Sequence, residues 1–440
     1  MTPPVVLFTR DLRLHDNPTL AQAVSVHPLV IPLFVLDDRL LGSPNRTAYL
    51  LGALRSLRDS LGGALVVRRG DVVDAIAALG ASAVYVADDA SAYATRRLRR
   101  LRERLDVHVT PGSAVVAPGD VHPVGGDHYR VFTPYWNAWS RAAVRPLART
   151  PAAIELPPGI DPGEIPALAD ITDGVPSPEL PASGETAARA LLSAFVAERL
   201  AQYDETRNGF APDATSGLST ALHFGCISAV EVARRVAGQP GTEPFLRQLC
   251  WRDFSLQLLA ARPDLPFADY RPRGDRWNDD EEGLLAWREG VTGYPIVDAS
   301  MRQLLAEGWM PGRARLLAAS FLVKHLRIDW RAGAAHFMAL LVDGDVASNS
   351  ANWQWVAGTG TDTRPNRMFN PVRQAHRFDP DGAYVRRYVP ELAGLSAKAI
   401  HEPWTLGAAA LAELGYPAPI VDHAAASAAF AAARTGAVAR

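Results

Sequence analysis

Residues 343–360, DGDVASNSANWQWVAGTG, combine side chains that could hold a polar heterocycle. Asp343 and Asp345 could accept hydrogen bonds from ring N–H groups, and Asn349 could meet a ring nitrogen. Two indoles follow, at Trp353 and Trp355. The same residues also have plain structural uses, because an Asp-Gly pair is a common turn, an Asp can cap a helix and tryptophans often pack in a core. The pattern is typical of either a heterocycle site or a capped, Trp-rich helix.

A second cluster, TSGLS at 215–219, places hydroxyl groups and backbone N–H groups ahead of a helical pattern. Such a segment can bind phosphate, and it can equally serve as a helix N-cap. Taken alone it does not decide between the two.

Several common chemistries are disfavoured. The chain has only two cysteines, Cys226 and Cys250, which argues against a disulfide framework and against a Cys-based metal site. The histidines lack the spacing of metal ligands, so we expect no metal. No Ser lies in a G-x-S-x-G elbow, and no G-x-G-x-x-G follows the first apolar run. Chemistry in this chain would need a cofactor.

The composition is that of an ordinary globular protein. The 440 residues are 48% hydrophobic and 21% charged, which predicts two to three domains. The N-terminus does not have the pattern of a signal peptide, and no apolar run is long enough to span a membrane, so we expect a soluble cytoplasmic protein. The formal net charge is −2, yet residues 301–400 carry 13 Lys/Arg against 8 Asp/Glu, which leaves room for a local basic face.

The elements that would position these residues fall into two kinds. Short β-branched runs alternate with helical patterns at the start of the chain, which predicts a Rossmann-like α/β domain with a parallel sheet over residues 1–135. We expect strands over 4–9, 29–36, 64–68, 83–87 and 107–109, and helices over 45–61, 71–79 and 91–105.

A Pro-, Gly- and acid-rich stretch follows and predicts a linker over 136–185. Strand signals then disappear, and residues 186–440 are predicted to form an all-helical domain. The expected helices include 186–203, 228–237, 243–262, 298–307, 313–328, 331–343 and 424–434.

Longer motifs in this order make the chain recognisable. They are FTRDLRLHDNPTL (8–20), TSGLS (215–219), LCWRDF (249–254), GYPIVDASMRQLLAEGWM (293–310), ASFLVKHLRIDWRAG (319–333), DGDVASNSANWQWVAGTGTD (343–362) and FNP (369–371). Together they resemble the DNA photolyase/cryptochrome family, and most closely its bacterial class I cyclobutane pyrimidine dimer photolyases. The resemblance runs almost from end to end of the chain.

The resemblance implies an α/β antenna domain and a helical domain that binds FAD in a U-shaped conformation. It also implies light-driven repair of DNA, in which reduced FAD passes an electron to a pyrimidine dimer flipped out of the duplex. The positions that match the family's FAD contacts are Tyr203, Thr215, Ser216, Gly217, Leu218, Ser219, Arg315, Asp343, Gly344, Asp345 and Asn349.

The resemblance also assigns roles to the tryptophans. Trp353, Trp330 and Trp277 match the inner, middle and outer members of the family's electron-transfer chain, and indole is an easily oxidised side chain. The positions that match contacts with the damaged DNA are Gln248, Trp251, Arg252, Arg313, Trp355 and Arg367.

The chain departs from the family pattern near the substrate. Gln248 stands where a Glu is usual, Gly312 replaces an Asn and Leu316 replaces a Met. Pro311 and Leu316 also replace the His pair expected for (6-4) photoproduct repair, which argues against that substrate.

Two alternatives to repair stay open at this point. One is a cryptochrome-like blue-light photoreceptor that has the flavin but no repair activity. The other is a Trp-rich helical DNA-binding module without flavin, which the set Asp343, Asn349 and Thr215 disfavours.

Arg46 and the stretch Asp89–Tyr93 resemble an antenna site for 8-hydroxy-5-deazaflavin. The alternatives are methenyltetrahydrofolate or no antenna chromophore. We further expect the protein to act on UV-damaged DNA as a monomer.

Overall fold

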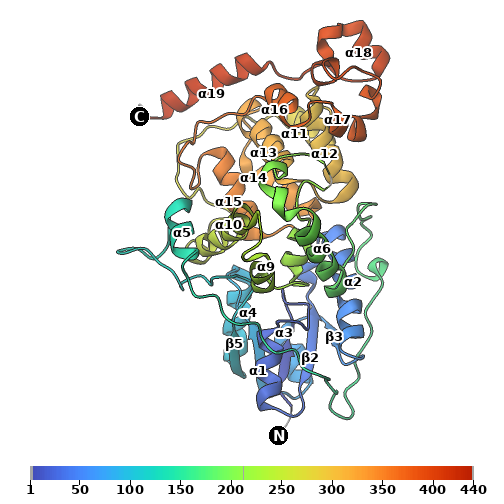
Figure 1. Ribbon diagram of the computed structural model, residues 1–440, viewed down its shortest axis with the longest axis vertical. Helices are drawn as coiled ribbons and strands as arrows, with labels where there is room; N and C mark the ends of the chain where they lie inside the picture. Colours follow the sequence, from blue (N-terminus) through green and yellow to red (C-terminus); the bar gives the residue numbers. More distant parts are fainter. Residues whose placement is uncertain (1–2, 212, 439–440) are drawn as a thin grey trace.

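The computed structural model describes residues 3–211 and 213–438, with side chains as far as Arg434. The molecule is elongated: the sheet domain lies at the end that holds the N-terminus, and the helical half lies at the other end (Figure 1). The helices are α1 (Pro18–Val26), α2 (Pro44–Ser60), α3 (Val72–Ala78), α4 (Ala92–Arg102), α5 (Phe132–Trp139), α6 (Glu185–Glu198), α7 (Tyr203–Thr206), α8 (Ser219–Phe224), α9 (Ala229–Val236), α10 (Thr242–Ala261), α11 (Glu281–Glu289), α12 (Pro295–Glu307), α13 (Gly312–Ser320), α14 (Trp330–Leu340), α15 (Val346–Ala357), α16 (Pro371–Phe378), α17 (Ala383–Tyr388), α18 (Ala408–Leu414) and α19 (His423–Val438).

The sheet has five parallel strands in the order β3-β2-β1-β4-β5. They are β1 (Val5–Leu7), β2 (Ile31–Leu36), β3 (Val66–Arg69), β4 (Ala83–Ala87) and β5 (Asp106–Thr110). Every residue of β1 and β2 is buried, as expected for central strands covered on both faces. The expected α/β domain with a parallel sheet is therefore confirmed. Because the strand order reverses between β1 and β4, the loops after these two strands meet at one end of the sheet.

The linker lies against the outside of the sheet domain (Figure 1). Its backbone is tied down at intervals: the Val67 N–H donates to Pro162 O over 2.8 Å, and the Glu179 N–H donates to Ala306 O over 3.1 Å. The boundary expected at residue 135 falls inside α5, a helix that contacts α10 of the helical half. The divisions at 135 and 185 remain predictions.

The two halves share one apolar core. A single cluster of buried residues includes Phe8 and Leu12 next to the sheet together with Phe195, Phe245 and Phe254 of the helical half. A second cluster contains the buried Trp287, Trp330 and Trp353 and lies within the helical half. Because the first cluster runs across the junction, apolar packing fixes the loop after β1 against the helical domain.

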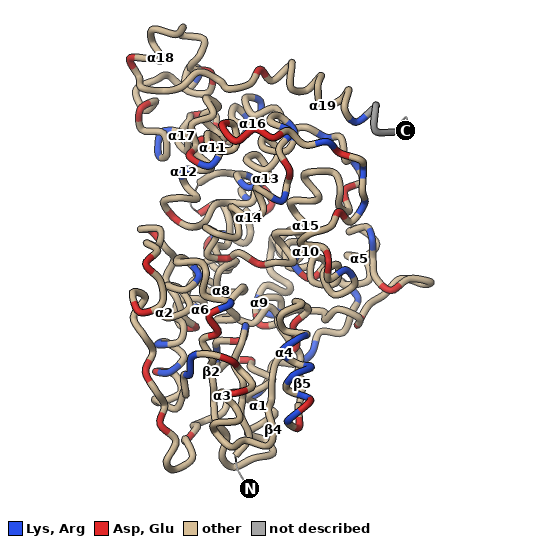
Figure 2. Tube along the Cα trace, turned by 180° about the vertical axis from the view of Figure 1, so that it is seen from behind, with Lys and Arg blue, Asp and Glu red and all other residues tan. Residues whose placement is uncertain are grey.

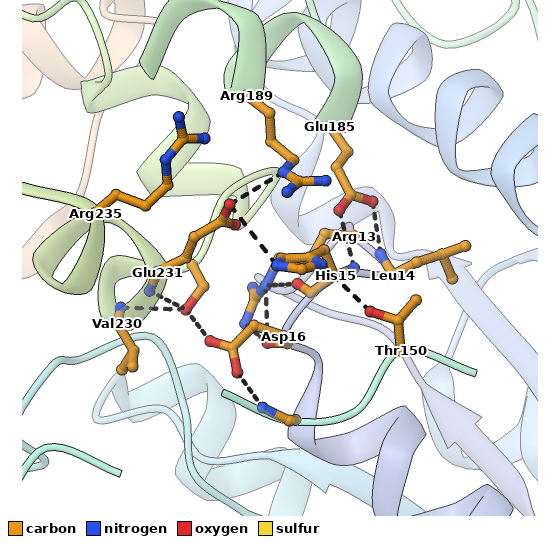
Figure 3. A network of polar contacts seen from close by, with 12 residues as sticks. Arg13, Leu14, His15, Asp16, Thr150, Glu185, Arg189, Val230, Glu231 and Arg235 are labelled. Carbon is orange, nitrogen blue, oxygen red and sulfur yellow. Dashed lines mark hydrogen bonds and ion pairs between the residues drawn. The ribbon is translucent and has the colours of Figure 1, made fainter. Parts of the chain in front are cut away.

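A polar network reinforces this junction (Figure 3). Glu185 at the start of α6 accepts the Leu14 N–H over 2.7 Å and the His15 N–H over 2.9 Å. Asp16, fully buried, accepts from Arg145 and from the Ser228 hydroxyl ahead of α9. The RLHDN part of the first motif therefore holds the two halves together.

One helix differs from its expected form. The pattern predicts a continuous helix over 313–328, whereas α13 ends at Ser320 and a π-helical turn, η4 (Phe321–His325), follows. The Leu326 N–H bonds to Phe321 O over 3.1 Å, and Arg327 then adopts a left-handed φ of 56°. The chain thereby turns and begins α14 at Trp330.

Basic and acidic residues are interspersed along both halves, with basic segments along α4 and near α16 (Figure 2). This distribution agrees with the near-neutral net charge of the chain. A basic surface that binds DNA would therefore cover only part of the molecule. Among the described residues, no helix is long and apolar enough to cross a membrane.

Candidate active site

One cavity of about 550 Å³ in the helical half gathers most of the residues singled out in the sequence. Its volume is in the usual range for a ligand pocket. Its lining includes Tyr203, Thr215, Ser216, Gly217, Leu218, Ser219, Gln248, Trp251, Arg252, Arg313, Arg315, Asp343, Gly344, Asp345, Asn349, Trp353 and Trp355. Residues 215–219 and 343–355 therefore line the same cavity, although more than a hundred residues separate them in the sequence.

An ion pair between the half-buried Arg315 and the buried Asp343 forms part of the cavity lining. Arg315 Nη2 lies 2.7 Å from Asp343 Oδ2, and Arg315 Nε donates to Met310 O. Burial alone would raise the pKa of Asp343, but the charge and hydrogen bond of Arg315 outweigh it and lower the pKa below its usual value. Asp343 is therefore an anion at neutral pH. Its Oδ1 is buried and has no hydrogen-bond partner among the described residues.

Asp345 both caps a helix and lines the cavity. Its Oδ1 accepts the Ser348 N–H over 2.8 Å at the start of α15, and its Oδ2 accepts from Arg10 Nη2 over 2.7 Å. Burial raises the pKa of Asp345, but the nearby positive charge of Arg10 more than offsets this and lowers it. Asp345 therefore serves both as a helix cap and as part of the cavity lining.

Arg10 comes from the sheet domain and was not singled out in the sequence. Its guanidinium also lies 3.5 Å from Asp89 Oδ2 and donates to His223 O over 3.1 Å. Burial, followed by the charge of Arg10, lowers the pKa of His223 to about 3, so His223 is neutral and Nδ1 can accept from Arg10. The sequence feature that could have indicated Arg10 is its place in FTRDLR, shortly after a strand that is central in the sheet.

Helix α15 presents Asn349 and Trp353 on one face, since residues four apart are neighbours on a helix. Asn349 Nδ2 donates to Ala334 O over 3.0 Å, which orients the carboxamide and leaves its Oδ1 and its second N–H for a ligand. The Trp353 indole packs on Gly333 so closely that a Cβ there would lie 2.1 Å from the ring. Gly333 therefore fixes the position of this indole.

The loop 215–219 also lines the cavity and offers hydroxyl groups. Gly217 has a left-handed φ of 70°, and the Ser216 hydroxyl accepts the Leu218 N–H over 3.3 Å. Thr215 Oγ1 is buried without a partner among the described residues. The Ser219 hydroxyl accepts from Trp309 Nε1 over 3.0 Å, and Trp309 is a further lining residue that the sequence did not indicate.

An aromatic platform stands at another part of the lining. Trp251 stacks on Phe132 of α5 with ring centroids 3.7 Å apart and planes 2° apart. One face of the indole is covered in this way, while Trp251 still borders the cavity. The neighbouring Arg252 donates to Ser113 O over 2.8 Å, and this bond fixes its guanidinium.

Arg313 borders the cavity near the sequence departures. It donates to Asn208 and to Gln374 Oε1, and its guanidinium lies 4.5 Å from the Phe378 ring. Burial lowers the pKa of Arg313, and the nearby Arg367 and Arg377 lower it further. Several positive charges therefore converge on this side.

The remaining predicted residues lie outside the lining. Arg367 is exposed, with its guanidinium 4.8 Å from the Phe369 ring. Trp330 is fully buried and Trp277 is half-buried, and both pack in the apolar cluster that contains Trp353. Arg46 donates to Met338 O and to Leu341 O at the end of α14, so its guanidinium lies at the junction of the two halves.

The cavity fits a flavin nucleotide. Thr215 Oγ1, Asp343 Oδ1 and Trp353 Nε1 are buried there without protein partners among the described residues. Unpaired buried polar atoms are rare in folded proteins, and several around one cavity indicate a polar ligand. The donor set combines hydroxyls, a carboxylate and a carboxamide with apolar rings, as a nucleotide with a heterocyclic ring requires.

Comparison with known proteins agrees with this site. Residues 4–154 match the family model described as DNA photolyase, and residues 245–435 match the one described as the FAD binding domain of DNA photolyase. A deoxyribodipyrimidine photo-lyase of Streptomyces griseus is 49% identical, with 99% of each chain covered. A cryptochrome DASH of Gloeobacter violaceus is 36% identical over 95% of this chain and 93% of its own.

Among solved structures, a bacterial class III photolyase from Agrobacterium tumefaciens has a TM-score of 0.91 and 36% identity, covering 100% of this chain and 98% of its own. Its class leaves the class I assignment a prediction. The helical half carries the FAD-binding domain of this family, and the resemblance seen in the motifs is confirmed. The parallel sheet, the cavity and the match to relatives over the full length of the chain together show that this chain belongs to the DNA photolyase family.

Proposed function

We propose that the protein uses light to split cyclobutane pyrimidine dimers in DNA, as a carbon–carbon lyase of the deoxyribodipyrimidine photo-lyase type. The observation that carries the proposal is that one cavity borders both a set of groups suited to a flavin and an aromatic platform suited to a base. The full-length relative from Streptomyces griseus with that name supports it. When bound in its reduced form, FAD supplies the light-driven electron that splits the cyclobutane ring and then receives it back.

The chain's own residues would hold this cofactor in distinct ways. Tyr203 and the segment Thr215–Ser219 would bind the phosphate and ribityl portions, because they offer hydroxyls and backbone N–H groups. Arg315 and Asp343 would flank the ring system, and the free Asp343 Oδ1 would accept a hydrogen bond from it.

Asn349 would tune the redox state. Asn349 lines the cavity with its carboxamide held by Ala334, and its Oδ1 would accept a hydrogen bond from a ring nitrogen that bears a proton. An N–H at that position belongs to the reduced ring, so Asn349 would favour the state needed for repair.

The damaged bases would stack on the free face of Trp251, whose other face Phe132 supports. Base stacking on an aromatic side chain is worth about 1–3 kcal/mol per base. Gln248 would donate or accept at a base edge, and Trp355 would close the side of the pocket. Arg252, Arg313 and the exposed Arg367 would meet phosphates, which position the strand without reading its sequence.

Trp353, Trp330 and Trp277 would carry electrons from the surface to the cavity when the cofactor arrives oxidised. Their burial supports this direction, since Trp353 lines the cavity, Trp330 is fully enclosed and only the outer Trp277 is half-buried. This route would prepare the cofactor and would take no part in the splitting step.

We also propose an antenna chromophore, 8-hydroxy-5-deazaflavin, at the carboxyl ends of β1 and β4. Asp89 supports the proposal because it follows β4 at the point where the strand order reverses. Arg46 lies at the same junction, but its engagement with α14 leaves its antenna role a prediction. The absorption spectrum of freshly purified protein tests this proposal, since methenyltetrahydrofolate and an empty site each give a different spectrum.

A repair assay tests the main proposal. FAD-loaded protein, reduced in the dark, is illuminated with an oligonucleotide that contains one dimer, and recovery of pyrimidine absorbance is followed. We expect recovery in blue light and none in the dark. A cryptochrome-like photoreceptor is the alternative, which Gln248 and Gly312 leave open and the similarity to a cryptochrome DASH supports. Absence of recovery with fully reduced cofactor would favour the photoreceptor over the repair enzyme.

We further propose that the protein works as a cytoplasmic monomer, which sedimentation and cell fractionation can test.

A further inference from the structure

A hydrogen bond joins the middle tryptophan of the proposed chain to a carboxylate. Trp330 has no exposed surface, and its Nε1 donates to Asp269 Oδ1 over 2.9 Å. The Asp269 side chain keeps 18% of its surface exposed. The bond therefore connects a buried indole N–H to a carboxylate that reaches solvent.

The position of Asp269 is fixed by the helix that lines the cavity. Gln354 of α15 is fully buried, and its Nε2 donates to Leu265 O over 2.7 Å and to Ala268 O over 3.0 Å. Its Oε1 accepts the Tyr270 N–H over 2.7 Å. Two hydrogen bonds before Asp269 and one after it thus hold this segment against α15, where Gln354 follows Trp353.

A guanidinium acts on the same indole in the opposite sense. Arg331 lies with its Cζ 4.6 Å from the centre of the Trp330 ring, and its Nη2 is 2.9 Å from Asp269 Oδ1. Its Nη1 also pairs with Asp329. A cation over an indole face stabilises the neutral ring and disfavours a positive charge on it. A carboxylate at the N–H favours that charge.

Oxidation would upset this balance. An indole that has lost an electron is positively charged beside the Arg331 guanidinium, and its N–H becomes acidic. Transfer of the proton to Asp269 removes the positive charge from the ring and relieves the repulsion. The geometry needs no rearrangement, because the N–H already points at the accepting oxygen.

We propose that Asp269 accepts the indole proton of Trp330 once Trp330 has been oxidised. The inference rests on the electron route of the proposed function, with light-excited oxidised flavin as the oxidant. An electron passes from Trp330 to the oxidised Trp353, the N–H bond of Trp330 breaks, and an O–H bond forms on Asp269. A neutral indolyl radical and a neutral carboxylic acid result. When Trp277 supplies an electron, the proton returns to the indole.

Asp269→Asn tests the step, because an amide oxygen still accepts the N–H bond but cannot take the proton. Asp329→Asn is the control: it removes the other carboxylate on Arg331, keeps a good N-cap for α14 and does not touch the indole. Time-resolved absorption after a flash distinguishes the cation radical of Trp from the neutral radical. We expect the neutral radical to be lost in D269N and the yield of photoreduction to fall about tenfold, the difference between a charged and a neutral hydrogen-bond acceptor, while D329N behaves as wild type. An unchanged neutral radical in D269N, or an equal loss in both variants, would overturn the proposal.

A second variant leaves Asp269 in place. Trp277→Phe stops the electron route at Trp330, and we expect the neutral radical to form there all the same. Persistence of the cation radical on Trp330 would show that Asp269 does not take the proton, and would also overturn the proposal. Dimer repair by dark-reduced protein is measured in parallel. Its absence, together with an intact radical sequence, would remove the proposed function and leave the role of Asp269 standing.

Discussion

At the residue scale, two positions in the cavity lining would decide how damaged DNA binds. Trp251 is a rigid platform because Phe132 stacks on one of its faces. Gly312 leaves open space where the family usually has an Asn, and an added Cβ there would meet nothing within 4 Å. Trp251 would supply affinity for bases, and Gly312 marks the position of a side chain that this sequence lacks.

Trp251→Ala should weaken binding of dimer-containing DNA about ten- to hundredfold, because one base loses its stacking partner. Trp251→Phe, which keeps a smaller platform, should give an intermediate affinity. Fluorescence anisotropy of a labelled oligonucleotide measures both. FAD absorbance should stay unchanged in either variant, and equal affinity of W251A and wild type would contradict the platform role.

Gly312→Asn should raise affinity for the dimer about fivefold, since it adds one hydrogen-bonding amide without steric conflict. Gly394→Asn is the matched control, because that exposed glycine also has open space around its Cβ and lies outside the cavity lining. Titration of damaged and undamaged oligonucleotides checks the prediction. A gain of equal size for undamaged DNA would mean that the amide does not meet the dimer.

At the element scale, helix α15 joins the cofactor groups to the sheet domain. Its N-cap, Asp345, is paired with Arg10 from the loop after β1, and its first turns carry Asn349. His223 is held neutral beside the same guanidinium, with its pKa lowered to about 3. Protonation of His223 would place a second positive charge next to Arg10, so acid should weaken this junction.

The sign of the pH dependence follows from the folded and unfolded pKa values. An unfolded His titrates near pH 6.5, so between pH 6.5 and 3 the unfolded chain binds more protons at His223 than the folded chain does. The contribution of His223 to the free energy of unfolding is therefore lost as the pH falls through this window, by at most about 1.4 kcal/mol per pH unit. Asp253, whose pKa is raised to about 6 mainly by burial, gives the opposite slope from about pH 4 to 6.

His223→Gln isolates the first contribution. Urea unfolding between pH 4.5 and 7 should show a shallower loss of stability on acidification than in wild type. His122→Gln, in an exposed loop, should leave the slope unchanged. If H223Q and wild type lose stability in parallel, His223 does not remain neutral in the folded protein.

The elements also show what the sequence could predict. The five strands lie within two or three residues of the β-branched runs, because a central parallel strand is apolar throughout. The 313–328 pattern did not reveal the π turn at 321–325, since helical periodicity alone does not separate α from π backbone. Arg10 was missed because it meets Asp345, 335 residues away, only after the two halves pack together.

At the scale of the whole molecule, the proposed function would divide two tasks between different residues around one cavity. Damaged DNA would approach past Trp251 and Arg313, while Trp353, Trp330 and Trp277 run from the cavity into the apolar cluster of the helical half. The family motifs indicated both sets of residues. The cavity that unites the loop 215–219 with α15 follows only from the tertiary fold.

Trp330→Phe should therefore separate the two tasks. Photoreduction of oxidised FAD should slow at least about tenfold, because the middle hopping site is lost, whereas repair by dark-reduced protein should stay within about twofold of wild type. Absorbance changes under steady illumination measure the first rate, and the dimer assay measures the second. Equal loss of both would mean that Trp330 serves the fold and not the electron route.

The claim that flavin and dimer share one cavity is tested most directly by the fluorescence lifetime of bound, reduced FAD. Addition of dimer-containing DNA should shorten this lifetime, because the excited electron gains an acceptor beside the ring, and undamaged DNA should leave it unchanged. The Trp251→Ala variant should need more DNA for the same effect. A lifetime that does not change at saturating dimer-containing DNA would contradict the account.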